Sequence, residues 1–229
     1  AARVAGSLEA CRRIGYDVPA WIEEGLVDIL IPAGGASTDP SIDVSEFVEL
    51  CRGTDVLVYP GLDAQVPGSA LGPEDVAHKD PMLNRAIASR HHRQGANGIY
   101  IFNWHANREA RRELLNQVGS LDTLRGTDKI YAATHRYLLN EGPWRGAFHN
   151  DRPWGQVPVA LKRTLTGDGP TISLEVADDI AAGSSPSVVL RVRLEQWVRG
   201  DMVGDGIGIS PCALQVLSLL DSSTTCGTP

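Results

Sequence analysis

Side chains suited to binding a hydroxyl-rich molecule come directly after short apolar runs in the first half of the chain. Asp63 comes after one run, and Asn103, Trp104 and His105 come at the end of another. A carboxylate, an amide and an imidazole exchange hydrogen bonds with hydroxyl groups, and an indole adds a flat apolar surface with an N–H donor. We therefore expect these residues to take part in recognising such a molecule.

Three apolar runs position these side chains. They cover residues 28–32, 56–62 and 98–104, and helix-patterned stretches separate them. Continuous apolar runs that alternate with helices are typical of parallel strands buried on both faces. In such sheets the ligand site lies at the carboxyl ends of the strands, which we expect to form one rim. The predicted helices cover residues 8–14, 19–24, 44–51, 81–94 and 108–118, with Ser7 as an N-cap and Gly25 as a stop.

A long loop is predicted between residues 63 and 79. Loops of this length inside a compact domain are usually functional. Glu74 and His78 lie in this loop and are candidates for lining a cleft, although solvated loop charges are the commoner outcome.

The second half of the chain has a different pattern. Residues 157–161, 171–176 and 188–194 alternate apolar and polar side chains and are separated by Gly, Pro, Asp and Ser. Such alternation indicates antiparallel strands with one solvated face, as in a β-sandwich. A domain boundary is expected near residues 125–150, and residues 205–229 form an irregular or aberrant tail.

Composition excludes several classes of function. The net charge is −7 and the pI is near 5.3, which argues against a nucleic-acid partner. No run approaches the ~18 apolar residues that span a bilayer. The four cysteines have no metal-type spacing, no nucleotide-binding motif is present, and no metal or other cofactor is expected. The chain starts with alanine and shows no signal peptide, so an extracytoplasmic location needs a signal on a longer parent chain.

Several stretches resemble glycosyl hydrolase-like family 10 proteins. They are Gly15–Pro32, which reads GYDVPAWIEEGLVDILIP, Val56–Leu62, which reads VLVYPGL, and Gly98–His105, which reads GIYIFNWH. Lys129–Tyr137, which reads KIYAATHRY, and the later Pro153-Trp154 are similar to the region after the barrel in bacterial members. The likeness covers about residues 1–200.

The resemblance implies an α/β fold: the C-terminal half of a (β/α)8 TIM barrel, followed by a mostly-β, sandwich-like domain, in truncated form. Residues 1–125 would run from the end of barrel strand five to strand eight, residues 126–204 would form the accessory domain, and residues 205–229 the tail. The first half of the barrel would then be missing from this chain, and with it the proton donor. The isolated fragment is accordingly expected to be inactive.

The same resemblance implies a function, the hydrolysis of O-glycosidic bonds in a poly- or oligosaccharide. Such hydrolysis normally uses two carboxyl groups. Asp63 would be the nucleophile or base, unless it merely caps its own turn. Trp104 would be the platform for a sugar ring, unless it plugs the end of the barrel. Asn103 and His105 would contact hydroxyl groups, unless Asn103 caps the following helix.

Two other classes of protein stay open. A non-catalytic carbohydrate-binding or cell-surface module would share the rim without the chemistry. An aldolase or phosphosugar enzyme would need a Schiff-base lysine or a basic phosphate site. Lys79 and Lys129 do not directly follow a strand, which counts against that class. The sequence leaves the oligomeric state open.

Overall fold

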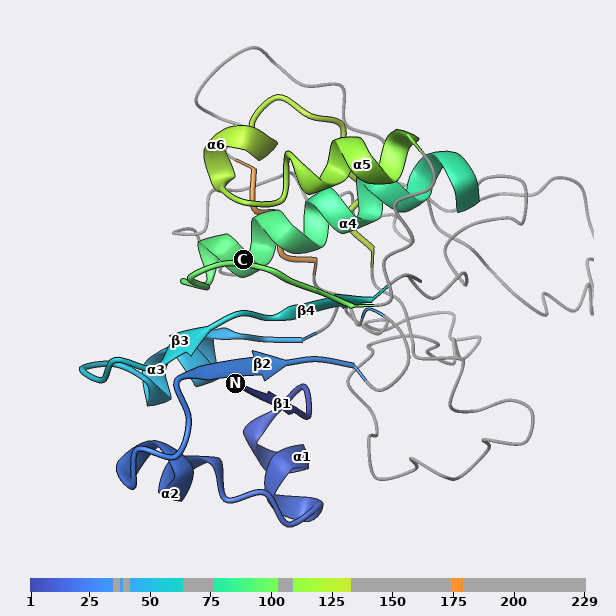
Figure 1. Ribbon diagram of the computed structural model, residues 1–229. Helices are drawn as coiled ribbons and strands as arrows, with labels where there is room; N and C mark the ends of the chain where they lie inside the picture. Colours follow the sequence, from blue (N-terminus) through green and yellow to red (C-terminus); the bar gives the residue numbers. More distant parts are fainter. Residues whose placement is uncertain (35–37, 39–41, 64–75, 103–108, 133–173, 179–229) are drawn as a thin grey trace, which may run out of the picture. The chain divides into compact units, whose positions relative to one another are not determined.

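A computed structural model of the chain describes residues 1–34, 38, 42–63, 76–102, 109–132 and 174–178 (Figure 1). The chain divides into two compact units, the first made of Ala1–Ala160 with Pro170–Ala177. The second unit consists of Leu161–Gly169 and Asp178–Pro229, of which only Asp178 is described. Every helix and strand of the described residues therefore belongs to the first unit.

The described strands are all paired in parallel. They are β1 (Ala2–Val4), β2 (Ile29–Pro32), β3 (Leu57–Val58), β4 (Gly61–Asp63) and β5 (Tyr100–Phe102). Their order is β1-β2-β3 and β4-β5. The parallel direction expected from the continuous apolar runs is thus confirmed for these strands.

Strands β3 and β4 belong to one extended stretch, residues 57–63. On one side of this stretch, the N–H of Tyr59 donates to the carbonyl of Leu30, over 2.9 Å. On the other side, the N–H of Tyr100 donates to the carbonyl of Pro60, over 3.0 Å. The stretch therefore joins β2 to β5, and the strands follow one another from β1 to β5 in chain order.

The helices are α1 (Leu8–Arg13), α2 (Val18–Glu23), α3 (Ser45–Leu50), α4 (Val76–Arg93), α5 (Glu109–Leu115) and α6 (Leu121–Leu124). Figure 1 shows α4 beside α5, with which it is in contact. Ser7 caps α1 as predicted, since its Oγ accepts the N–H of Ala10 over 3.1 Å. Gly25, with φ of 66°, follows the end of α2, a backbone angle that glycine adopts without steric cost.

Helix α4 differs from the prediction. It was expected to cover residues 81–94, but it begins at Val76 and carries Pro81 inside. Proline lacks an N–H, so its position removes one hydrogen bond of the ladder without ending the helix. The predicted loop over residues 63–79 is therefore wrong for residues 76–79, which include His78. The short helix α6 was not predicted.

Apolar side chains from the strands and helices form two cores on the helix-covered face of the sheet. The first core joins β1–β3 to α1–α3 and consists of Val4, Cys11, Val18, Val27, Leu30, Phe47, Cys51 and Val58. The second joins β4 and β5 to α4–α6 and consists of Leu62, Leu83, Ile87, Ala88, Leu114, Val118 and Leu124, with Ile99 and Ile101 packed against them.

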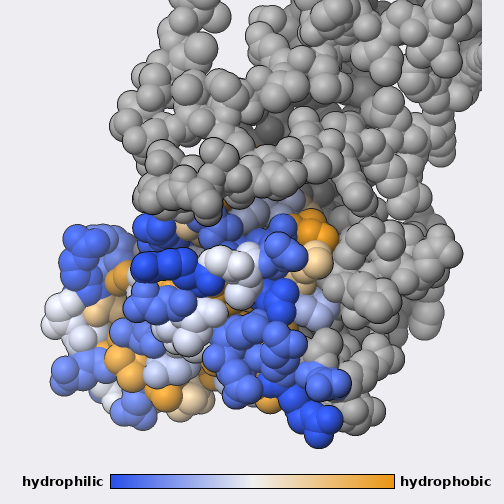
Figure 2. Space-filling model, turned by 90° about the horizontal axis from the view of Figure 1, so that it is seen from above, coloured by the Kyte–Doolittle hydropathy of each residue, from blue (hydrophilic) through white to orange (hydrophobic). Residues whose placement is uncertain are grey.

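On the face drawn in Figure 2, the coloured residues are mostly hydrophilic, with hydrophobic ones scattered between them.

The predicted strands of the second half lie almost wholly outside the described residues. Of residues 171–176, the described ones, 174–176, belong to no strand. The domain limits at 125, 204 and 229 stay predictions. Among the described residues, no helix has the length and apolar character needed to cross a bilayer.

Candidate functional site

The carboxyl ends of the parallel strands lie next to one another. Val4 of β1 is level with Pro32 of β2, and Asp63 of β4 is level with Phe102 of β5. Strand register thus puts the backbone of Asp63 directly beside the residue that precedes Asn103. This edge is where the sequence predicted a binding site.

The start of β4 packs closely against the residue that follows β2. A Cβ added to Gly61 would lie 2.7 Å from the Cβ of Ala33, which follows β2. Real Cβ atoms do not approach that closely, so glycine is required for this contact between β4 and the end of β2. The edge therefore has a tight backbone framework.

Few of the predicted site residues can be placed in detail. Asp63 is the last residue of β4, and its side chain lies outside the described part of the structure. His78 is in the first turns of α4, again without a described side chain. Asn103, Trp104, His105 and Glu74 lie outside the described residues. Their roles therefore stay predictions, except that register brings Asp63 next to the start of the 103–105 segment.

Arg3 is a residue at this edge that the sequence analysis missed. Its Nη2 donates to the carbonyl of Gly34 over 3.0 Å, and its Cζ lies 4.4 Å from the centre of the Phe102 ring. The ring of Phe102 is in turn stacked with that of Tyr100, with 6.3 Å between centres. A guanidinium over an aromatic face is an attractive cation–π arrangement. Arg3 thus connects β1, the residues after β2, and β5.

The face on which Arg3 lies can be assigned from strand alternation. Its neighbours Ala2 and Val4 pack against the first core, while Ile99 and Ile101 of the β5 region pack against the second. Successive side chains of a strand point to opposite faces. Arg3 and Phe102 therefore project from the face turned away from the helices.

The contact between Arg3 and Phe102 also shows that the sheet is curved. Register makes Arg3 level with Ile31, and continuing the pairing of Leu30 with Val58 makes Ile31 level with Tyr59. Phe102 is level with Asp63, about four residues further along the same stretch.

In a flat sheet this offset and three strand spacings would separate the two Cα atoms by ~20 Å. An extended arginine side chain and a phenylalanine ring together do not reach so far. The sheet therefore curls toward the face that carries Arg3 and Phe102.

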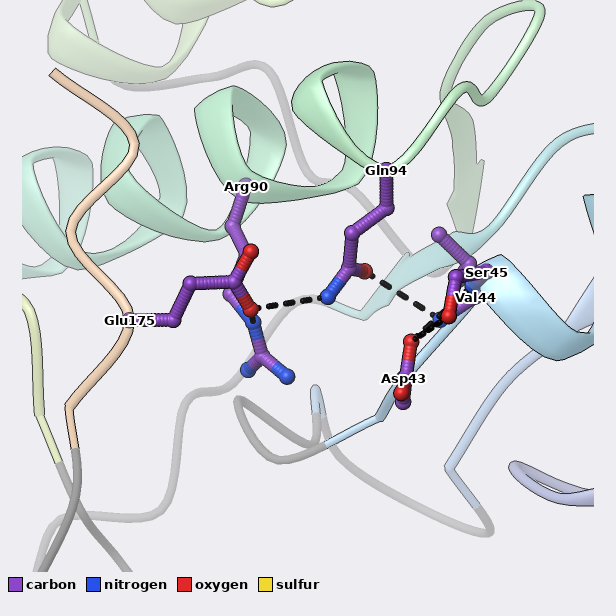
Figure 3. A network of polar contacts seen from close by, with 6 residues as sticks. All are labelled: Asp43, Val44, Ser45, Arg90, Gln94 and Glu175. Carbon is purple, nitrogen blue, oxygen red and sulfur yellow. Dashed lines mark hydrogen bonds and ion pairs between the residues drawn. The ribbon is translucent and has the colours of Figure 1, made fainter. Parts of the chain in front are cut away.

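A second polar cluster lies away from this edge and fastens a distant segment to α4 (Figure 3). Arg90 Nε and Gln94 Nε2 both donate to Oε2 of Glu175, over 2.7 and 2.9 Å. Gln94 Oε1 accepts the N–H of Val44 over 3.2 Å, and Arg93 Nε donates to the carbonyl of Ala177 over 2.9 Å. All these groups are used in holding segments together, so we assign the cluster a structural role.

A cavity of about 220 Å³ lies at the opposite end of the strands. Its lining includes Cys51, Arg52, Thr54, Leu57 and Asn97, which lie near the start of β3 rather than its carboxyl end. Burial raises the pKa of the Cys51 thiol, and it raises the pKa of the Cys11 thiol to about 11. Both thiols are therefore protonated at neutral pH, and neither is a ready nucleophile.

The comparisons with known proteins give no family. No protein-family model matches the chain, and no curated protein matches it. The described residues hold no group of three or more His, Cys, Asp or Glu side chains able to bind a metal ion.

Proposed function

We propose that the chain is part of a glycoside hydrolase-like protein that hydrolyses O-glycosidic bonds of a poly- or oligosaccharide. The fold in this proposal is part of a (β/α)8 barrel, resembling that of glycosyl hydrolase-like family 10, followed by a mostly-β domain. The observation that carries the proposal is the parallel register that places Asp63 beside Phe102, directly before Asn103 and Trp104.

The curvature of the sheet supports the barrel in this proposal. Strands β1–β5 are parallel, helices pack on one face, and the sheet curls toward the other. A (β/α)8 barrel has helices outside and strand carboxyl ends around its active site. Asp63, at such an end, is in the position from which a barrel residue reaches a substrate.

In this mechanism Asp63 acts as nucleophile or as the base that activates water. Trp104 stacks on the sugar ring, and Asn103 and His105 bind hydroxyl groups. The mechanism requires a second carboxyl group as the proton donor. Among the five described strands, Asp63 is the only carboxylate.

A second candidate function is non-catalytic carbohydrate binding, which requires no second carboxyl group. A module of this kind would use the same edge, with Trp104 as its main contact, and would not change the saccharide. Binding without turnover distinguishes it from the hydrolase.

The test uses the parent protein with the complete barrel, because in this proposal the proton donor lies outside the 229-residue chain, and a panel of cello-, xylo-, malto-, chito- and galacturono-oligosaccharides. Binding is measured by isothermal titration, and cleavage is followed by chromatography of the products. For a hydrolase, Asp63→Asn lowers the cleavage rate by about 10²-fold or more while the Kd changes little.

Asp55→Asn is the matched control for this test. It is an exposed aspartate in the same segment of chain, before β3 rather than after β4. Equal cleavage by the wild type and both variants would remove Asp63 from the mechanism. Binding without cleavage would favour the carbohydrate-binding module, and no binding by any saccharide would refute both functions.

A further inference from the structure

We propose that the pair Asn97 and Gly98 is a modification site at which the chain deamidates, and that the fold restrains this reaction through two hydrogen bonds to Val58. The proposal is independent of the proposed carbohydrate site. In the reaction the backbone nitrogen of Gly98 attacks Cγ of Asn97, so that a C–N bond forms and the side-chain nitrogen leaves as ammonia. Water then opens the succinimide ring at either carbonyl and leaves aspartate or isoaspartate. A water is consumed and an ammonia is released, and no other reactant takes part.

The first support is the pair of residue types and its access to water. Asn97 and Gly98 form the only asparagine–glycine pair in the sequence. Glycine has no Cβ, so its backbone nitrogen can approach the preceding side chain with little steric hindrance. Asn97 is exposed and lines the cavity at the start of β3. The chemistry of deamidation is therefore available at this position.

The second support is the way in which Asn97 is held. The N–H groups of Leu57 and Tyr59 donate toward the segment that carries β2, and the buried Val58 between them turns its N–H and carbonyl to the opposite side. There the N–H of Val58 donates to Oδ1 of Asn97 over 2.8 Å. The N–H of Asn97 in turn donates to the carbonyl of Val58 over 2.9 Å. These two hydrogen bonds, the Val58 clamp, fix both the side chain and the backbone of Asn97, so the clamp must open before the ring can close.

The isoaspartate product does not fit the start of β5. In isoaspartate the main chain runs through the side-chain CH2, so the chain gains one atom just before Gly98. Gly98 is buried against the ring of Tyr59, since a Cβ added to it would lie 2.4 Å from Cε1 of that ring. Two residues later, Tyr100 is level with Gly61 in the pairing of β5 with β4. An additional main-chain atom displaces Gly98 from its tight position and with it the register of β5.

The experiment compares the folded chain with an unstructured peptide of the same sequence. The 229-residue chain and a synthetic peptide of residues 93–101 are incubated at mildly alkaline pH, and the products are identified by chromatography and mass spectrometry. We expect deamidation of Asn97 to be at least about tenfold slower in the folded chain, because only the open clamp reacts. Urea below the unfolding transition should raise the rate in the chain and leave that of the peptide almost unchanged. Asn116, exposed but followed by Gln117, is the internal control and should stay intact.

The variant Asn97→Asp separates the effect of the additional main-chain atom from that of the new charge. It keeps a side-chain oxygen for the N–H of Val58, and its main chain has the same length as that of the wild type. The isoaspartate form is purified from chain aged in urea and returned to buffer. Its amide hydrogens in residues 98–102 should exchange at least about tenfold faster than those of Asn97→Asp.

Equal rates of deamidation in the folded chain and the peptide would overturn the proposal, because the Val58 clamp would then provide no restraint. So would an intact Asn97 in chain that is fully unfolded in urea, or deamidation of Asn116 as fast as that of Asn97. An isoaspartate form whose residues 98–102 exchange as slowly as those of Asn97→Asp would refute the disruption of β5. Each of these results leaves the proposed carbohydrate site standing.

Discussion

His91 should make the fold sensitive to acid, and the size of the effect can be calculated. Its side chain in α4 is 1% exposed, and among the described residues neither ring nitrogen has a hydrogen-bond partner. Burial lowers the pKa of His91 from 6.5 to about 3, and neighbouring Arg90 and His92 act in the same direction. Gln94 and Asp43 act in the opposite direction but do not outweigh burial.

The direction of the pH effect is set by the difference in the pKa of His91 between the folded and the unfolded chain. In the unfolded chain His91 takes up a proton below about pH 6.5, whereas in the folded chain it stays neutral until about pH 3. Protonation therefore favours the unfolded chain as the pH falls from 6.5 to 3. Each pH unit in that window removes about 1.4 kcal/mol of stability, or about 3 kcal/mol between pH 7 and pH 4.

The assay is urea unfolding of the wild type and of His91→Leu at pH 7, 6, 5 and 4. Leucine is apolar and does not titrate, so the wild type should lose about 3 kcal/mol relative to it between pH 7 and pH 4. Carboxylates that titrate equally in both proteins contribute the same amount to both free energies of unfolding, so their contribution drops out of the difference between wild type and His91→Leu. His92→Leu is the control, because the ring of that histidine is only half-buried and its Nε2 is 2.8 Å from the carbonyl of Val118. A difference between wild type and His91→Leu that stays constant with pH would refute the reasoning.

Three further predictions concern packing, an ion pair and a thiol. Gly61→Ala should destabilise the fold by about 1–3 kcal/mol through overpacking, whereas Gly119→Ala, with open space around it, should stay within about 0.5 kcal/mol, both measured by urea unfolding. In a double-mutant cycle, Arg90→Ala and Glu175→Ala should show a coupling of about 0.2–1 kcal/mol that shrinks in 1 M NaCl; no coupling at low salt would contradict the contact. Cys11, buried and with a pKa of about 11, should react with iodoacetamide at pH 8 only after urea is added, as followed by peptide mass spectrometry; rapid labelling of the native chain would contradict its burial.

Local signals explain why much of the described fold was predictable. A cap such as Ser7 and a stop such as Gly25 act within a few residues of their helix, so the boundaries of α1 and α2 were predicted closely. The apolar runs located the β2, β3–β4 and β5 regions, and their continuity indicated parallel pairing. Helix α4 was harder, because it begins at Val76 and carries Pro81 inside, whereas proline is usually found in the first turn of a helix.

The candidate site was predictable only in part. The position of Asp63 at a strand end is a local property and was predicted. The contact of Arg3 with Phe102 joins residues almost a hundred positions apart and depends on the curvature of the sheet. In the sequence, Arg3 is a cation in an otherwise apolar strand. Its contact with Phe102 can be recognised only when the positions of the neighbouring strands are known.

Hydrogen–deuterium exchange with a bound saccharide tests the central claim most directly. The 229-residue chain is saturated with whichever oligosaccharide of the panel has the lowest Kd, and amide exchange is compared with that of the chain alone. The account predicts slower exchange at the carboxyl edge, in peptides that cover residues 30–34 and 98–105. Protection confined to residues 51–58 and 95–97, around the cavity at the opposite end of the strands, would contradict it.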